Sequence, residues 1–325
     1  MQNSGELHEN AASDSPPESN TGKNASLKKH FRKKERTRKS MWFAGCFVLL
    51  AICCMADHFF NRPPEDPEYD PEKFELSADC SEFPYLQLTE TDISELPEKA
   101  VSIALREYSD LCEIKKGGDY ILSGDLSGSV RIDARDENVH LFLDGVSITS
   151  RSGPAILCGN ADKLIITLLP ETENTVSDSD DYRAYSAAEA CIYSACSLTI
   201  NGTGKLSAAG FYKDAIRSKD ILKVLNSNIM VKCKETGLRG NDGIIIKNAD
   251  VSISTEKTGI KTKNAGENGR GNVVVDGGAL SVIAGRYSFE LAEGDLYIAD
   301  CRVNSKSVIS SCKTGGSMYI QEGCI

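Results

Sequence analysis

The sequence predicts an all-β chain that folds as a parallel β-helix, a solenoid, preceded by a single transmembrane helix. Short β-type runs separated by Gly, Asn, Asp and Ser fill the chain from Cys112 onward and show no helical period. Related motifs recur along these runs, namely KDAIRSKD, ETGLRGND and KTGIKTKN. Sixteen uncharged residues, MWFAGCFVLLAICCMA, stand near the N-terminus.

The first sixty residues divide into two predicted segments. Residues 1–40 are polar and lack an apolar period, so we expect a disordered, basic, cytoplasmic segment. Residues 41–60 suffice for a transmembrane signal anchor, because about 20 helical residues cross a bilayer core. Eight Lys and Arg residues between Leu27 and Met41 stand against a single Glu35, which predicts a cytoplasmic N-terminus and an extracellular C-terminal domain at the cell membrane. A cleaved signal peptide is the alternative, but a polar segment of forty residues is too long for it.

The next two segments lead into the β-rich region. Residues 61–75, rich in Pro and acids, predict a semi-extended stalk. Residues 76–111 form an introductory segment with room for a short helix, and the β-rich domain covers 112–325. The net charge of −10 and the pI of about 5.1 argue against nucleic acid as a partner.

The twelve cysteines do not predict a metal or redox motif. Three of them lie in the 41–60 segment, which leaves an odd number outside it, and no pair has CxxC spacing. We expect buried free thiols for several of them.

The β-rich region repeats itself at intervals of just over twenty residues. Self-similarity at this length is typical of a solenoid whose repeats stack on one another, with three short strands in each repeat. Leucine-rich repeats would need a Leu pattern that is absent, and a sandwich would not place the same residue types at the same point of each period. The aliphatic anchors of the repeats are Ile156, Ile192, Ile216, Leu238, Ile260, Phe289 and Ile309.

Several blocks of the sequence, in order, resemble a known family. They are AILCGNADKLIITLLPETENTVSDS, AACIYSACSLTINGTGKLSAAG, DAIRSKDILKV and GLRGNDGIIIKNADVSIS, after an opening of GGDYILSGDLSGSVRIDA and VHLFLDGVSITSRSGPAI. This region resembles the carbohydrate-binding family of bacterial cell-surface β-helix proteins, whose fold is similar to that of pectate lyases. The resemblance implies a right-handed parallel β-helix that binds acidic polysaccharide such as polygalacturonate, with associated calcium and without an established catalytic role.

One departure from that family concerns calcium. Its members carry paired acids before the aliphatic anchor, whereas the positions here read Lys213-Asp214, Glu235-Thr236, Lys257-Thr258 and Arg286-Tyr287. Calcium needs several oxygen ligands. The candidate metal ligands are Asp214 with Glu235, Asp220 with Asp242, and the loop acids Asp178, Asp180 and Asp181.

Basic residues directly follow the anchors in three successive repeats. Stacked repeats place equivalent residues in columns, so Arg217, Arg239 and Lys261 are expected in one outward-facing column. A repeating row of cations suits a polymer with one carboxylate per sugar, which Arg can grip in bidentate fashion, and binding would weaken with salt. The predicted ligand-binding residues are Tyr193, Arg217, Lys219, Arg239, Asn241, Lys261 and Lys263.

The sequence leaves three functions open. The first is a membrane-anchored, non-catalytic binder of acidic polysaccharide, with Tyr193 as the best aromatic platform ahead of Tyr182, Tyr185, Phe211 and Tyr212. The second is a lyase for uronate polymers, with Lys219, Arg217 or Arg239 as the base. The third is a structural or adhesive surface protein. For each basic residue taken singly, the alternative is an ordinary solvated surface charge.

Overall fold

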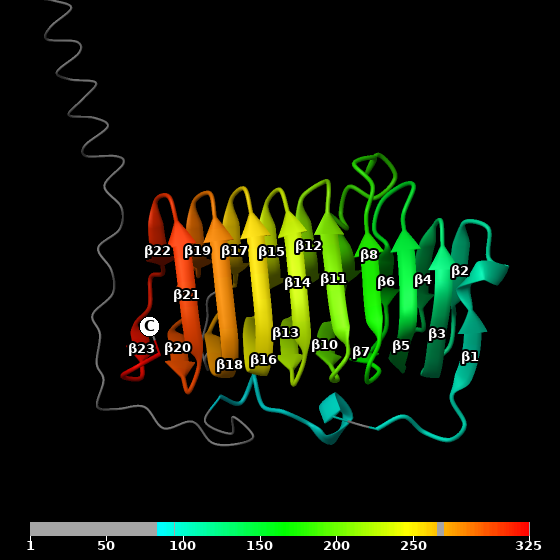
Figure 1. Ribbon diagram of the computed structural model, residues 1–325, viewed down its shortest axis with the longest axis horizontal. Coiled ribbons are helices and arrows are strands. Elements are labelled where there is room, and N and C mark those ends of the chain that lie inside the picture. The colour runs from blue at the N-terminus through cyan, green and yellow to red at the C-terminus, as the bar shows by residue number, and fades with distance from the viewer. Residues whose placement is uncertain (1–82, 94, 265–269, 325) are drawn as a thin grey trace, which may run out of the picture. The chain divides into compact units, whose positions relative to one another are not determined.

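The computed structural model describes residues 83–93, 95–264 and 270–324. These residues all belong to one compact unit, 63–325. Its strands are short and pair in parallel, and Figure 1 shows the strands of successive turns of the chain side by side along one axis. Each turn of the chain is called a layer below.

One sheet of nine strands takes one strand from each layer. In spatial order it contains β2 (Leu111–Ile114), β4 (Ser129–Asp133), β6 (Ile156–Asn160), β9 (Ala190–Ser194), β12 (Asp214–Ser218), β15 (Thr236–Gly240), β17 (Thr258–Lys261), β19 (Tyr287–Glu290) and β22 (Ser310–Lys313).

The second sheet has fourteen strands and bends into two wings. The first wing contains β7 (Lys163–Leu168), β10 (Ser197–Asn201), β13 (Ile221–Leu225), β20 (Leu296–Ala299) and β23 (Met318–Ile320). The second wing contains β8 (Glu173–Ser177), β11 (Lys205–Gly210), β14 (Asn228–Cys233) and β21 (Arg302–Ser307). Four longer strands and a short one complete the sheet: β3 (Gly118–Leu126), β5 (Asn138–Thr149), β16 (Gly243–Thr255), β18 (Val273–Ala284) and β1 (Val101–Ala104).

The chain bends between the wings at residues whose backbone dihedral angles lie in the left-handed region. Asn226 and Asn248 have φ values of 48° and 50°, which Asn adopts more readily than most residues. Gly277 takes the same place one layer on, with a φ of 73°, and a Cβ there would lie 2.3 Å from Asn248 Oδ1. Local backbone chemistry therefore turns the chain at the same point in successive layers.

The core is a column of aliphatic side chains along the axis. Ile156, Ile192, Ile216, Leu238, Ile260 and Phe289 pair layer upon layer in the nine-stranded sheet and are buried. The expectation for the last layer is wrong: Cys312 lies opposite Phe289, whereas Ile309 is 42% exposed. The loop before β22 is longer than the spacing of aliphatic residues suggests.

A segment ahead of the strands, Phe83–Ile93, lies against the first wing and is called the clamp segment. It ends in the 3-10 helix η1 (Glu90–Ile93). Leu86 packs with Leu225, Ile245 and Val274, so the clamp segment covers outward-facing residues that would otherwise meet water. The introductory segment holds, besides η1 and β1, only the 3-10 helix η2 (Leu105–Glu107) among the described residues, in place of the expected short helix.

The predicted fold class, a right-handed parallel β-helix of three short strands per repeat after a transmembrane helix, is wrong as stated. The chain is all-β, but its strands form two sheets, because β5, β16 and β18 run unbroken through the bend and join both wings. The described residues also contain no helix long and apolar enough to cross a membrane.

The predicted localisation is corrected on the same finding. The expected span over 41–60, the cytoplasmic segment 1–40 and the stalk over 61–75 lie outside the described residues. In the part of the chain that is described, the two helices have 4 and 3 residues, and neither is long and apolar enough to cross a membrane.

Candidate functional site

The outer face of the nine-stranded sheet carries the predicted row of bases. Arg217 pairs with Tyr193 on one side and with Arg239 on the other, and Lys261 follows Arg239. Each of these residues comes directly after a buried anchor, so its side chain points to the opposite face of the strand. Arg217, Arg239 and Lys261 are called the basic column. The basic column is part of a longer row of paired residues across the nine strands. In order, this row contains Glu113, Arg131, Leu157, Tyr193, Arg217, Arg239, Lys261, Glu290 and Lys313.

Arg217 and Arg239 are partly buried and incompletely paired. Their side chains are 11% and 17% exposed, and the Nε of each is buried without a hydrogen-bond partner. Arg217 Nη1 lies 3.9 Å from Glu189 Oε2, and Arg239 Nη1 lies 3.6 Å from Asp214 Oδ2. These separations are too long for strong hydrogen bonds. The buried Nε atoms are out of reach of a ligand, but the Nη groups of the two adjacent arginines make only these long contacts and so keep donor capacity for an anion.

The positive charges of Arg217 and Arg239 repel each other in a partly buried site. Burial lowers the pKa of the Arg239 guanidinium, and the neighbouring charge of Arg217 lowers it further. Burial raises the pKa of Asp214, although Arg239 and Arg217 oppose that shift. A carboxylate from a ligand would relieve the repulsion between the two guanidinium groups.

Lys261 differs from the two arginines because its charge is already balanced. Lys261 Nζ lies 2.9 Å from Glu290 Oε2, which also accepts a hydrogen bond from Thr258 Oγ1 at 3.1 Å. Lys313 Nζ is 3.7 Å from the other oxygen of Glu290. The sequence does hold the signal for Glu290, since it follows Phe289 as Lys261 follows Ile260.

Tyr193 is not available as a sugar platform. It is only 4% exposed, it packs with Ala188 and Ala190, and Arg217 lies over its ring at 6.0 Å. Ala188 belongs to the loop that precedes β9, so this loop packs against Tyr193. Spacing places Tyr193 in the column correctly, but it cannot show that the loop packs against the ring.

The other predicted aromatic platforms have different surroundings. Tyr182 is 3% exposed and stacks on Tyr212 at 4.3 Å, whereas Tyr185 accepts a hydrogen bond from Arg131 at 2.8 Å. Phe211 is 54% exposed. Of these rings, Phe211 is the one that solvent reaches most freely.

The second predicted column lies at the turn after these strands. The backbone nitrogens of Lys219, Asn241 and Lys263 each donate to a carbonyl of the layer before, at 2.9, 3.2 and 3.2 Å. The side chains of Lys219 and Lys263 are exposed, whereas Asn241 Oδ1 is buried without a partner. Two exposed cations therefore lie beside the basic column.

The predicted metal ligands are engaged by protein groups. Asp214 Oδ1 accepts from Thr236 N at 3.1 Å, and Glu235 pairs with Lys257 at 2.6 Å. Asp242 accepts from the side chain of Asn264, and burial, together with Asp242, raises the pKa of Asp220.

These pairs do not make a calcium cage. Calcium takes about 6–8 oxygen ligands, and no cluster of three or more His, Cys, Asp or Glu side chains suited to a metal occurs within the described residues. The loop acids Asp178 and Asp181 are bound by Tyr182 and Arg183 at 2.7 and 2.8 Å. The residues present therefore do not fit calcium well. Calcium binding stays a prediction from the family resemblance.

Comparison with known proteins adds to this geometry of three basic residues on successive parallel strands. The family of carbohydrate-binding domain-containing proteins matches residues 109–321, and the chain belongs to this family. A carbohydrate-binding domain-containing protein of Acetivibrio thermocellus is 31% identical over 232 residues, which cover 69% of this chain and 79% of that protein.

A solved structure also resembles this fold. The polysaccharide lyase-like protein from C. thermocellum, as a gadolinium derivative, has a TM-score of 0.63 and 29% sequence identity. The match covers 66% of this chain and 89% of that one. The resemblance inferred from the sequence is thus confirmed at the level of a carbohydrate-binding family with a polysaccharide lyase-like relative.

Proposed function

We propose that the protein binds an acidic polysaccharide, a polyuronate, along the outer face of the nine-stranded sheet without cleaving it. The observation that carries the proposal is the pair Arg217 and Arg239, whose guanidinium groups are adjacent, partly exposed and held to acids only by contacts of 3.9 and 3.6 Å. The chain belongs to a carbohydrate-binding family, which supports a polysaccharide as the anionic ligand.

The geometry suits one carboxylate per layer. Neighbouring strands lie about 4.8 Å apart, and an extended sugar chain advances by a comparable step. A uronate carboxylate between Arg217 and Arg239 would accept charge-assisted hydrogen bonds from both, and the next one would meet the exposed Lys219 or Lys263. Lys261 contributes less, because Glu290 already neutralises it.

The test is a titration of the purified protein with polygalacturonate at low and high salt, with and without calcium. We expect saturable binding that weakens as salt rises. Arg217→Gln and Arg239→Gln should each lower the affinity about tenfold or more, the value of one charge-assisted hydrogen bond. Lys232→Gln is the matched control, because Lys232 is an exposed cation of β14 on the second wing.

Two results would contradict the proposal. One is affinity that neither arginine variant changes, and the other is binding that salt does not weaken. Retained thermal unfolding temperatures would show that the variants still fold. A dependence on calcium would restore the metal expected from the family resemblance, whereas its absence would remove it.

A polyuronate lyase is the second candidate, and the similarity of the fold to a polysaccharide lyase-like protein favours it. A lyase base takes the proton next to the uronate carboxyl, and Lys219, Arg217 or Arg239 would have to act as that base. Unsaturated products absorb in the ultraviolet, so the same titration followed by absorbance separates the two functions. A steady rise that Arg239→Gln abolishes would establish cleavage, and a flat trace would establish binding alone.

A further inference from the structure

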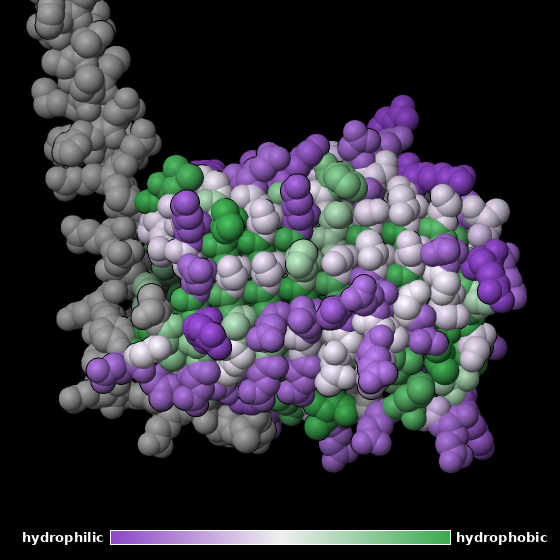
Figure 2. Space-filling view, viewed as in Figure 1, coloured by the Kyte–Doolittle hydropathy of each residue, from purple (hydrophilic) through white to green (hydrophobic). Residues whose placement is uncertain are grey.

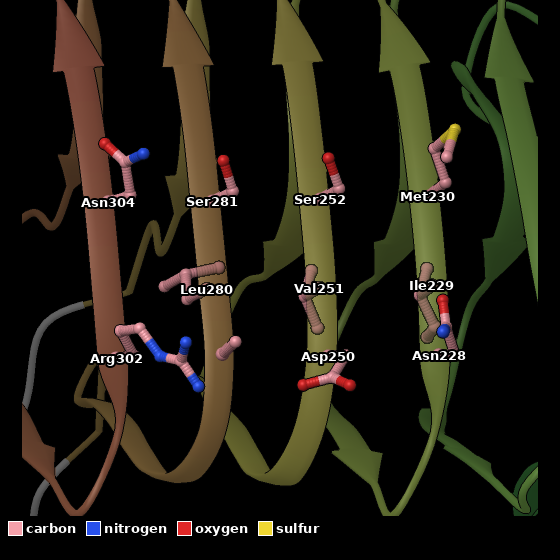
Figure 3. A pocket seen from close by; sticks show the side chains of 11 residues that line it. Asn228, Ile229, Met230, Asp250, Val251, Ser252, Leu280, Ser281, Arg302 and Asn304 are labelled. Atoms are coloured by element: carbon pink, nitrogen blue, oxygen red, sulfur yellow. The ribbon is translucent and has the colours of Figure 1, made fainter.

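The second wing carries a hollow that the basic column does not explain. It has a volume of about 380 Å³ and crosses β14, β16, β18 and β21 on their outer face (Figure 3). Asn228 and Met230 stand at one end, and Arg302 and Asn304 stand at the other (Figure 3). This hollow is called the trough.

The trough exists because the two central strands carry small side chains. Residues of four layers pair as one row, Met230 with Ser252, Ser252 with Ser281, and Ser281 with Asn304. In the neighbouring row Ala279 stands between Asp250 and Arg302. Two serines and an alanine therefore form a low floor between longer side chains. Figure 2 shows this face as rows of pale and purple residues with green between them.

The polar groups around the trough are not used by the protein itself. The side chains of Asn228, Asp250, Ser252, Ser281, Arg302 and Asn304 make no hydrogen bond or ion pair within the residues that the structure describes. Convergent free donors and acceptors around a hollow are typical of a ligand site. Met230, 60% exposed, adds an apolar wall.

The charge of the trough differs from that of the basic column. One carboxylate, Asp250, and one guanidinium, Arg302, leave it neutral overall, and the remaining polar groups are hydroxyls and amides. Such groups both donate and accept hydrogen bonds, as sugar hydroxyls do. A chain of carboxylates would gain nothing from Asp250, so an uncharged sugar fits better than a uronate.

We propose that the trough is a second carbohydrate site, which takes an uncharged oligosaccharide segment. Its four strands span three strand spacings, so the segment has about three sugar units at about 4.8 Å each. The sugar chain runs across the strands, with its hydroxyls bound by Asp250, Arg302 and Asn304 and one ring face against Met230. Without an aromatic platform among the lining residues, binding is weak and is insensitive to salt.

The test is a titration of the full chain with cellotriose and xylotriose, followed by backbone amide chemical shifts. We expect saturable shifts at residues 228–230, 250–252, 279–281 and 302–304. Ser281→Ile fills the floor with an aliphatic side chain that offers no ring to a sugar and should abolish these shifts, and Arg302→Ala should weaken binding at least threefold. Lys306→Ala is the matched control, because Lys306 is exposed on the same strand but outside the trough.

Three outcomes would overturn the proposal: no shifts with either neutral trisaccharide, shifts confined to the nine-stranded sheet, or binding that Ser281→Ile leaves unchanged. Tri-galacturonate serves as the charged comparison and should not shift the trough residues. The trough lies on a different face from Arg217 and Arg239, so the failure of either proposal leaves the other intact. Arg239→Gln should not alter the response to the neutral sugars.

Discussion

Asp178 shows how a single buried group sets a pH dependence. It is 3% exposed, and it accepts hydrogen bonds from Tyr182 Oη at 2.7 Å and from the backbone nitrogen of Phe211. Burial raises its pKa from 3.8 to about 6. The folded state therefore binds a proton that the unfolded state releases between those values. The contribution of this group makes the protein more stable as the pH falls from about 6 to about 4.

Asp178→Asn should raise the free energy of unfolding at pH 7 by about 1–3 kcal/mol and leave it little changed near pH 4. The new amide can donate to Tyr182 Oη, which itself donates to Ala190 O at 2.9 Å. Urea unfolding at the two pH values measures the difference. Asp180→Asn, an exposed change in the same loop, is the control. A variant less stable than the parent at pH 7 would contradict the assignment.

The cysteines are a residue-scale feature that the sequence predicted well. The eight described cysteines are buried, as expected for thiols packed in a core. Cys158 Sγ and Cys196 Sγ lie 3.9 Å apart, although 38 residues separate them along the chain. No spacing rule identifies that neighbourhood, because it depends on how two layers stack.

At the scale of elements, Asp92 fixes the clamp segment. It is fully buried and receives hydrogen bonds from Lys223 Nζ at 2.8 Å and Thr199 Oγ1 at 2.5 Å, besides its pairing with Lys163. Burial opposes its ionisation, but the hydrogen bonds from Lys163 and Lys223 hold the pKa of Asp92 well below its ordinary value. Its stabilising effect is present above about pH 4 and is lost as the pH falls.

Asp92→Ala should lower the free energy of unfolding by about 3–5 kcal/mol, because the buried Lys223 and the partly buried Lys163 lose their carboxylate partner. The clamp segment should then exchange its amide hydrogens faster and become open to proteases. Hydrogen exchange of residues 83–93 measures the release directly. Glu90→Ala changes an exposed acid of the same 3-10 helix and should leave exchange unaltered. Unchanged exchange in Asp92→Ala would show that apolar contacts alone hold the segment.

Nothing in the sequence marks Asp92 for this role. Its partners Lys163 and Lys223 lie far along the chain on β7 and β13, and the layers bring them together. The missed elements, the clamp segment and the packing of the preceding loop against Tyr193, share this cause. Both are contacts between an irregular segment and a finished sheet, for which sequence periodicity carries no information.

At the scale of the whole molecule, stability depends on the continuous column of anchors. Leu238→Ala, in a central layer, should lower the free energy of unfolding by about 2–5 kcal/mol, since it leaves a cavity in the core. Ile283→Ala removes an aliphatic side chain that is 57% exposed and should change little. Thermal unfolding of the two variants makes the comparison. Equal losses in both would mean that the layers do not unfold as one column.

The sequence by itself determined the all-β content, the carbohydrate-binding family, and the row of Arg217, Arg239 and Lys261. These features are local: alternation sets which way a side chain points, and a repeat near 22 residues sets what stacks on what. Only the tertiary structure decided the rest. It joined the two wings into one sheet, neutralised Lys261 with Glu290, covered Tyr193 and opened the trough. These outcomes depend on bends, loop paths and relative side-chain sizes in neighbouring layers, which become definite only when the layers pack.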